Sequence, residues 1–181
     1  RWDPTCATFE PVENTHVFIS EATFGLPVFR HPPTEHEIDR LMRSVADNPD
    51  RTHCIGAYSL GKAQRVIKHL RLAGHDRPIY IHGSLEKLCE VYEAAGVTLG
   101  ELRPATLEDR SKAAREAFRG EIVIAPPGAF EGKWAQRFPD PVIGFASGWM
   151  SVKQRAKQRG VELPLVISDH ADWDELTDTI R

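Results

Sequence analysis

Short apolar runs alternate with segments of helical periodicity along most of this chain, and that alternation limits its fold more than any other feature. The apolar runs predicted to be strands lie at residues 54–58, 78–81, 122–125, 142–146 and 163–167. The helices predicted around them lie at residues 34–48, 62–72, 85–95, 108–118, 133–138 and from 173 onward. Strands that alternate with helices of about ten to fifteen residues indicate βαβ units and a mostly parallel sheet flanked by helices. The predicted fold class is therefore α/β.

The first predicted helix has a capping signal at its start. Thr34 is predicted to cap the N-terminus, and Glu37, three residues later, completes the pattern of a capping box. The apolar residues Ile38, Leu41 and Val45 follow at helical spacing. One face of this helix is therefore expected to be buried.

Glu21 directly follows an apolar run at residues 17–20. This order is typical of a buried strand that presents a carboxylate at its C-terminal end. Carboxylates in such places carry out acid and base chemistry or orient ligands, so Glu21 is a candidate catalytic residue. A helix cap or a surface acid would give the same local pattern.

A second candidate is the run Ser-Asp-His-Ala-Asp at residues 168–172, which lies between a predicted strand and the last predicted helix. Neutral imidazole binds a divalent metal through one ring nitrogen, and a carboxylate can orient the ring by accepting the other N–H. His170 is therefore a candidate metal ligand. The alternative is that Asp169 or Asp172 caps the last helix. Of the other histidines, only His82, at the end of a predicted strand, is placed like a ligand.

Composition excludes several classes of protein. The three cysteines lie far apart and form no Cys-x-x-Cys pair, which argues against a disulfide framework and a cysteine zinc site and fits a cytoplasmic protein. No apolar run approaches the roughly 18 residues that a membrane span needs, so no membrane partner is expected. The sequence contains no glycine-rich nucleotide-binding loop and no Gly-x-Ser-x-Gly element.

The formal net charge is -3, so contact with a nucleic acid would need a local basic patch. One candidate places four cations at alternate positions: Lys153, Arg155, Lys157 and Arg159. As a strand this segment would present all four on one side, whereas a helix would spread them around its axis. Accessible lysines and arginines suffice for phosphate contacts. A solvated charged surface is the alternative.

The order of these motifs resembles the β-CASP nucleases, the branch of metallo-β-lactamase proteins that cut DNA and RNA. Glu-Ala-Thr-Phe-Gly at residues 21–25 resembles the family's Glu-Ser-Thr-Tyr-Gly element, and residues 58–64 resemble its Ala-Leu-Gly-Arg-Ala-Gln-Glu helix start. Residues 123–128 stand in place of Ala-Ser-Pro-Gly, and residues 168–172 resemble Ser-Ala-His-Thr-Asp. The run Ser-Gly-Trp-Met at residues 147–150 is most similar to bacterial DNA ligase-associated exonucleases.

This resemblance implies a layout and an activity. Residues 1–25 would belong to a metallo-β-lactamase domain, residues 26–159 to an inserted β-CASP domain, and residues 160–181 would return to the first domain. The implied activity is that of a zinc-dependent DNA exonuclease in repair, with two Zn²⁺ ions in the complete enzyme. His170 matches the last zinc-ligand histidine and Glu21 the acid that supports the histidine network. The basic segment would follow the phosphate backbone, and an ATP-dependent DNA ligase and a helicase are the implied protein partners.

Two departures from the family pattern qualify these expectations. The His-x-His-x-Asp-His motif that carries most zinc ligands does not occur in the sequence, so the chain is expected to be part of a longer enzyme and inactive by itself. Gln154 stands where the family has a general-acid histidine, and an amide cannot donate a proton as an acid. An RNA-processing nuclease and a non-catalytic nucleic-acid-binding module are the alternatives.

Overall fold

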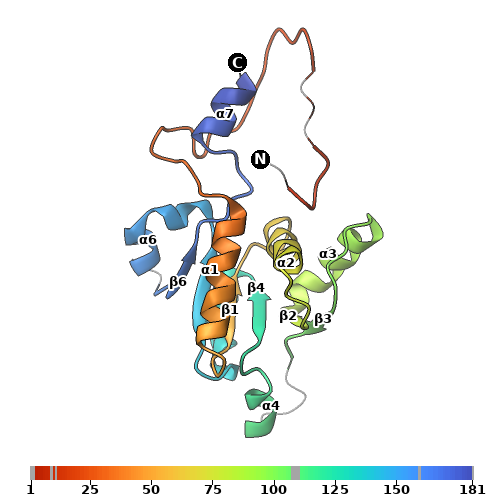
Figure 1. Cartoon of the computed structure of the whole chain (residues 1–181), viewed down its shortest axis with the longest axis vertical. Coiled ribbons are helices and arrows are strands. Elements are labelled where there is room, and N and C mark those ends of the chain that lie inside the picture. The colour runs from red at the N-terminus through yellow and green to blue at the C-terminus, as the bar shows by residue number, and fades with distance from the viewer. Residues whose placement is uncertain (1–2, 9, 11, 107–110, 159, 181) are drawn as a thin grey trace.

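The computed structural model describes residues 3–8, 10, 12–106, 111–158 and 160–180, and within them a six-stranded parallel sheet forms the centre of the molecule (Figure 1). The strands are β1 (His53–Gly56), β2 (Ile79–Ile81), β3 (Leu102–Pro104), β4 (Ile122–Ala125), β5 (Val142–Ala146) and β6 (Leu163–Leu165). Their order across the sheet is β3-β2-β4-β1-β5-β6, and every neighbouring pair is parallel. The predicted α/β class and parallel sheet are confirmed.

The helices complete the βαβ pattern. They are α1 (Thr34–Asp47), α2 (Lys62–Leu72), α3 (Gly83–Ala94), α4 (Lys112–Glu116), α5 (Pro127–Phe130), α6 (Lys153–Gln158) and α7 (Trp173–Ile180), with short 3₁₀ turns η1 (Ala135–Arg137) and η2 (Gly148–Ser151). None of the helices described is long and apolar enough to cross a membrane. The loop at residues 168–172 follows the carboxyl end of β6, and ligand sites of parallel sheets are typically found at that edge.

Both faces of the sheet are covered, because alternate strand residues point to opposite sides. Ile55 and Ile124 pack into a large cluster with apolar residues of α1, α2 and α3. Cys54 and Val123, their neighbours in sequence, face the other side and pack with an aromatic group that includes Phe118. Strands buried on both sides read as the continuous apolar runs seen in the sequence.

The predicted buried strand at residues 17–20 is wrong. This segment has no regular secondary structure, and Val17 and Ile19 are 73% and 90% exposed. A strand needs a partner for its backbone N–H and C=O groups, and the described sheet ends at β3 and β6 without pairing to it. Apolar periodicity alone does not supply that partner.

The predicted capping box at the start of α1 is also wrong. Thr34 is already helical, and the cap position is held by Pro33 without a side-chain hydrogen bond. The carboxylate of Glu37 instead accepts a hydrogen bond of 2.9 Å from the backbone N–H of Val166 and pairs with Arg40 at 2.6 Å. A buried carboxylate is stabilised by such donors, so Glu37 fixes α1 against the chain leaving β6.

The sequence reading missed the edge strand β3, whose burial is incomplete and which ends at Pro104. Proline is tolerated at a sheet edge, but it weakens the strand pattern in the sequence. The helix predicted at 108–118 is observed only as α4, and residues 107–110 lie outside the described part of the chain.

Candidate functional site

Glu21 and His170 meet in space, although they lie far apart in the sequence. The Oε2 atom of Glu21 lies 3.3 Å from Nδ1 of His170, and the two side chains are 44% and 46% exposed. A carboxylate at one ring nitrogen orients an imidazole and leaves Nε2 for another partner. Glu21 and His170, candidates from two separate sequence motifs, therefore form one acid–histidine pair.

The backbone of its own loop holds Glu21 in its charged form. Partial burial raises the pKa of this carboxyl group, but the hydrogen bonds from Thr23 and the neighbouring His170 outweigh that effect and lower the pKa below its usual value. The Thr23 N–H donates to Oε2 of Glu21 at 2.8 Å. At neutral pH Glu21 is thus a carboxylate that accepts hydrogen bonds.

The loop that carries His170 is closed by local hydrogen bonds. The Ser168 hydroxyl accepts a hydrogen bond from the His170 N–H at 3.0 Å, which fixes the turn. Oδ1 of Asp172 accepts from the N–H groups of Asp174 and Glu175, each at 3.1 Å, and Glu175 accepts in return from the Asp172 N–H. The helix-cap interpretation of Asp172 is therefore confirmed, with reciprocal bonds like those of a capping box.

Two cations from α2 secure the same loop, and the sequence reading did not single them out. Nζ of Lys62 lies 2.8 Å from Oδ1 of Asp169, and the Lys62 side chain is 3% exposed. The guanidinium of Arg65 donates to the Ser168 carbonyl at 2.8 Å. The pKa of Asp169 is raised by burial and lowered by Lys62, with a net decrease. The signals available in the sequence were that Lys62 lies in the motif at residues 58–64 and that both cations lie in the first turns of an amphipathic helix, and neither signal gives a partner.

An aromatic cluster around Phe24 lies beside the ring of His170. The ring of Phe24 is buried and lies 6.1 Å from that of His170, 4.6 Å from His31 and 4.9 Å from Trp149, measured between ring centres. Gly148 allows this approach, because a Cβ atom there would lie 2.5 Å from Cζ of Phe24. The motif residues 24 and 147–150 thus act as a support for His170.

A cavity of about 540 Å³ opens over the pair. Its lining includes Glu21, Asp169 and His170, with Phe18 and Ile19 from the exposed apolar segment at residues 17–20. His82 is placed elsewhere: its ring caps α3 through Ser84 and packs on Trp134 at 5.0 Å between ring centres. The expectation that His82 is placed like a ligand is thus not supported by its observed contacts.

The residues that the structure describes do not form a complete zinc centre. No group of three or more His, Cys, Asp or Glu side chains that could hold a metal ion occurs in the part of the chain that the structure describes. Zinc sites in proteins use three or four protein ligands. The pair of Glu21 and His170 could supply one imidazole ligand together with the carboxylate that orients it.

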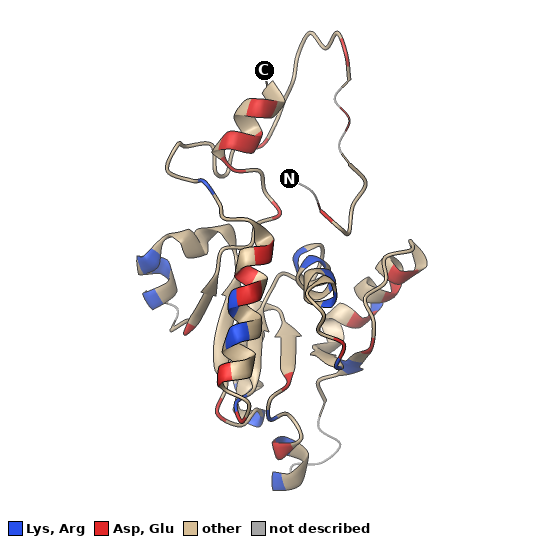
Figure 2. Ribbon diagram, viewed as in Figure 1, with Lys and Arg blue, Asp and Glu red and all other residues tan. Residues whose placement is uncertain are grey.

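The basic segment forms a short helix, α6, and not a strand. Lys153, Arg155 and Lys157 are exposed on it, while Arg159 lies outside the described residues. Figure 2 shows these cations gathered on α6, whereas α7 carries acidic charges. The guanidinium carbon of Arg155 lies 3.9 Å from the ring centre of Trp149, which joins the basic helix to the aromatic support of His170.

Comparison with known proteins identifies no family. No family model matches the chain, and no curated protein matches it. Among solved structures, the crystal structure of a protein of unknown function from Enterococcus faecalis V583 is similar with a TM-score of 0.49 and 12% sequence identity. The alignment covers 88% of this chain and 41% of that protein, so the chain spans less than half of its length.

Proposed function

We propose that this chain is part of a metal-dependent phosphodiester hydrolase, a DNA exonuclease of the β-CASP type that works with a DNA ligase in repair. The observation that carries the proposal is the contact between Glu21 and His170, 3.3 Å apart. The two residues belong to separate sequence motifs, and the buried cations Lys62 and Arg65 hold the loop of His170 in the position where it meets Glu21. In this proposal His170 binds one metal ion and Glu21 orients its ring.

The remaining metal ligands would come from chain beyond these residues. When bound, two zinc ions would supply a hydroxide nucleophile and stabilise the leaving oxygen. The residues of this chain hold His170 in place and exclude part of the solvent from it. Residues 1–25 and 160–181 would belong to the metallo-β-lactamase domain, and residues 26–159 to the β-CASP domain. A cytoplasmic location and a ligase and helicase as partners are parts of the same proposal.

The charges of α6 support a nucleic acid as the substrate. Its three described cations are exposed, and the guanidinium of Arg155 lies over the ring of Trp149. A guanidinium over an indole ring is positioned by a cation–π contact, and its N–H groups can still donate to phosphate oxygens. DNA is the polymer that we propose, with RNA as the alternative on the same scaffold.

A cleavage assay in the protein that carries this segment tests the proposed activity. His170→Ala is expected to lower chelator-sensitive cleavage of labelled DNA by more than about a hundredfold, and Glu21→Gln by about 10- to 100-fold. His36→Ala, an exposed histidine on α1, is the matched control and should cleave normally. Normal cleavage by His170→Ala would refute the proposed role of the pair.

The salt dependence of DNA binding tests α6 separately. Reversing the charges of Lys153, Arg155 and Lys157 is expected to weaken binding and to flatten the plot of log affinity against log salt by about two to three units of slope. Lys87→Glu on α3 is the control, since that side chain is exposed on another helix. An unchanged slope in the triple variant would remove α6 from the binding surface.

One observation favours a second candidate, a nucleic-acid-binding module without catalysis. Within the described residues no set of metal ligands is complete. A protein that binds DNA through α6 but neither cleaves it nor retains zinc would fit this alternative, and the same two assays separate the candidates.

A further inference from the structure

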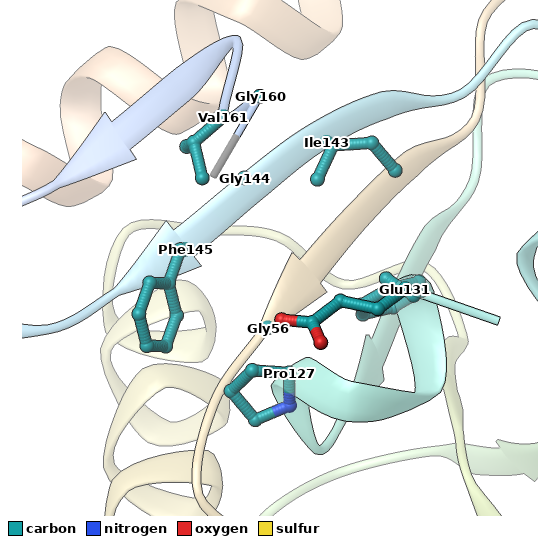
Figure 3. A pocket seen from close by; sticks show the side chains of 9 residues that line it. Gly56, Pro127, Glu131, Ile143, Gly144, Phe145, Gly160 and Val161 are labelled. Carbon is teal, nitrogen blue, oxygen red and sulfur yellow. The ribbon is translucent and has the colours of Figure 1, made fainter. Parts of the chain in front are cut away.

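A second pocket, of about 230 Å³, lies on the sheet face opposite α1 and α2 (Figure 3). Its floor is formed by residues of β1 and β5, one wall by α5 and the chain after it, and the other wall by the residues that follow α6. The lining residues are Gly56, Pro127, Phe130, Glu131, Ile143, Gly144, Phe145, Gly160 and Val161.

The pocket exists because the helices on this face form two separate groups. Phe130 and Ile143 belong to one aromatic cluster, while Phe145 and Val161 belong to another with residues of η2 and α6. Gly56 keeps the floor open between them, since a Cβ atom there would lie 3.3 Å from both Phe145 Cδ2 and Pro127 Cα. The gap runs from the carboxyl ends of β1 and β4 toward the starts of β5 and β6. A concave site with mostly apolar walls is a typical ligand position.

One carboxylate, that of the exposed residue Glu131, is among the groups that line this pocket. Figure 3 shows the Glu131 side chain extending toward Gly56 over Pro127, and all three line the pocket. A carboxylate only accepts hydrogen bonds, so a matching ligand presents donors along one edge of a flat apolar body. Among nucleobases, guanine presents two adjacent donors, N1–H and the 2-amino group, which fit a carboxylate as a pair. Adenine and cytosine place a ring-nitrogen acceptor beside their amino group, which a carboxylate repels.

The wall beside Val161 is the end of the basic helix. The Gly160 N–H donates to the Lys157 carbonyl at 3.2 Å and the Val161 N–H donates to the Ala156 carbonyl at 3.1 Å, the pattern of a Schellman motif, with Gly160 at φ +61°. The C-terminal end of α6 is therefore fixed beside the pocket, which Gly160 and Val161 line directly after it. A base in the pocket carries a negatively charged backbone, and α6 supplies the opposite charge at the adjoining surface.

Tyr58 lies between the pocket and the candidate site and contacts a residue from each side. The ring of Tyr58, 53% exposed, packs edge-on against Phe145 at 6.4 Å between ring centres. On its other side Nζ of Lys62 lies 4.9 Å from the Tyr58 ring centre, and Lys62 pairs with Asp169 next to His170. A chain of side-chain contacts thus links the pocket to the loop of His170.

We infer that this pocket binds an unstacked guanine base of a nucleic acid strand, with Glu131 accepting from its Watson–Crick edge and the phenylalanines contacting its plane. Recognition of unpaired bases by stacking and by hydrogen bonds to that edge is common for single strands. The choice of a nucleic acid as the ligand rests on the proposed function. The pocket itself does not require cleavage.

Titration of guanosine into the ¹⁵N-labelled chain tests the inference. The expected result is saturable shifts at the amides of Gly56, Ile143 and Val161, with tighter binding of guanosine than of inosine, which lacks the 2-amino group, or of adenosine. Glu131→Gln should weaken guanosine binding by about tenfold, because one charge-assisted contact is lost. Val161→Trp should abolish binding by filling the pocket.

Glu90→Gln, an exposed glutamate on α3, is the matched control, and the amide spectrum of each variant reports whether it folds. Equal affinity of guanosine and inosine, wild-type affinity in Glu131→Gln, or tighter binding of N-acetyltryptophanamide than of guanosine would each overturn the inference. Loss of guanosine binding while His170-dependent cleavage stands removes only the pocket assignment. Guanosine binding without cleavage supports the pocket and removes the proposed nuclease.

Discussion

The ion pair between Lys62 and Asp169 is predicted to couple the stability of α2 to the loop of His170. Lys62 is almost fully buried, whereas Asp169 is 36% exposed, so the two members of the pair differ in access to water. Replacing Asp169 by Asn leaves a buried ammonium without its carboxylate. Replacing Lys62 by Met leaves a carboxylate that water can still reach.

The magnitudes follow from that asymmetry. Removing one partner of a fully buried pair costs about 3–5 kcal/mol, and we expect Asp169→Asn near the lower end, at about 3 kcal/mol, because the pair is partly open. Lys62→Met is expected to cost about 1 kcal/mol, since surface-exposed charges gain little from pairing. The double variant removes both charges and should cost about 2 kcal/mol, which corresponds to a coupling energy of about 2 kcal/mol.

Urea unfolding of the wild type, both single variants and the double variant measures this coupling. The pKa of Asp169 is lowered in the folded state, so the coupling should be complete above the unfolded value of about 3.9 and should vanish as the pH falls through the folded pKa. Single effects that add to the double effect within about 0.5 kcal/mol at neutral pH would refute the reasoning.

Two further predictions concern the frame around the site. Burial lowers the pKa of three histidines, with nearby arginines adding to the effect, and these histidines are His53, His69 and His75. Below about pH 6.5 the unfolded chain therefore binds more protons than the folded chain. The urea concentration at the unfolding midpoint should decrease as the pH is lowered from about 7.5 to about 5.5, and an unchanged midpoint would contradict this. Gly148→Ala should cost about 1–3 kcal/mol because its Cβ would collide with Phe24, whereas Gly128→Ala, with no atom within 4 Å of its Cβ, should be near neutral in the same unfolding assay.

The elements with strong apolar periodicity could be predicted closely. The predicted strands at 122–125 and 142–146 and the helix at 62–72 have the observed bounds of β4, β5 and α2. Their apolar residues are buried on both sheet faces or on one helix face, so the pattern and the packing agree. Gly74, in the left-handed region at φ +86°, directly follows the C-cap of α2, a position that favours glycine.

Features that depend on distant partners could not be predicted in this way. The run at 17–20 has strand composition but no described strand beside it, and Glu37 bonds to Val166 in preference to the start of its own helix. Motif order did select Glu21 and His170, yet no sequence feature predicted that Lys62 and Arg65 are buried or which groups they bind. A side chain that is buried because of one contact across the fold leaves no periodicity in the sequence.

Zinc content is the measurement that tests the central claim most directly, namely that His170 with Glu21 serves a metal-dependent nuclease. Elemental analysis of the protein that carries this segment is predicted to give about two zinc ions per chain, as in two-metal hydrolytic sites. His170→Ala should lower that content and His36→Ala should not, while residues 1–181 alone should retain little zinc. Full zinc content in His170→Ala, or no zinc in the complete wild-type protein, would contradict the account.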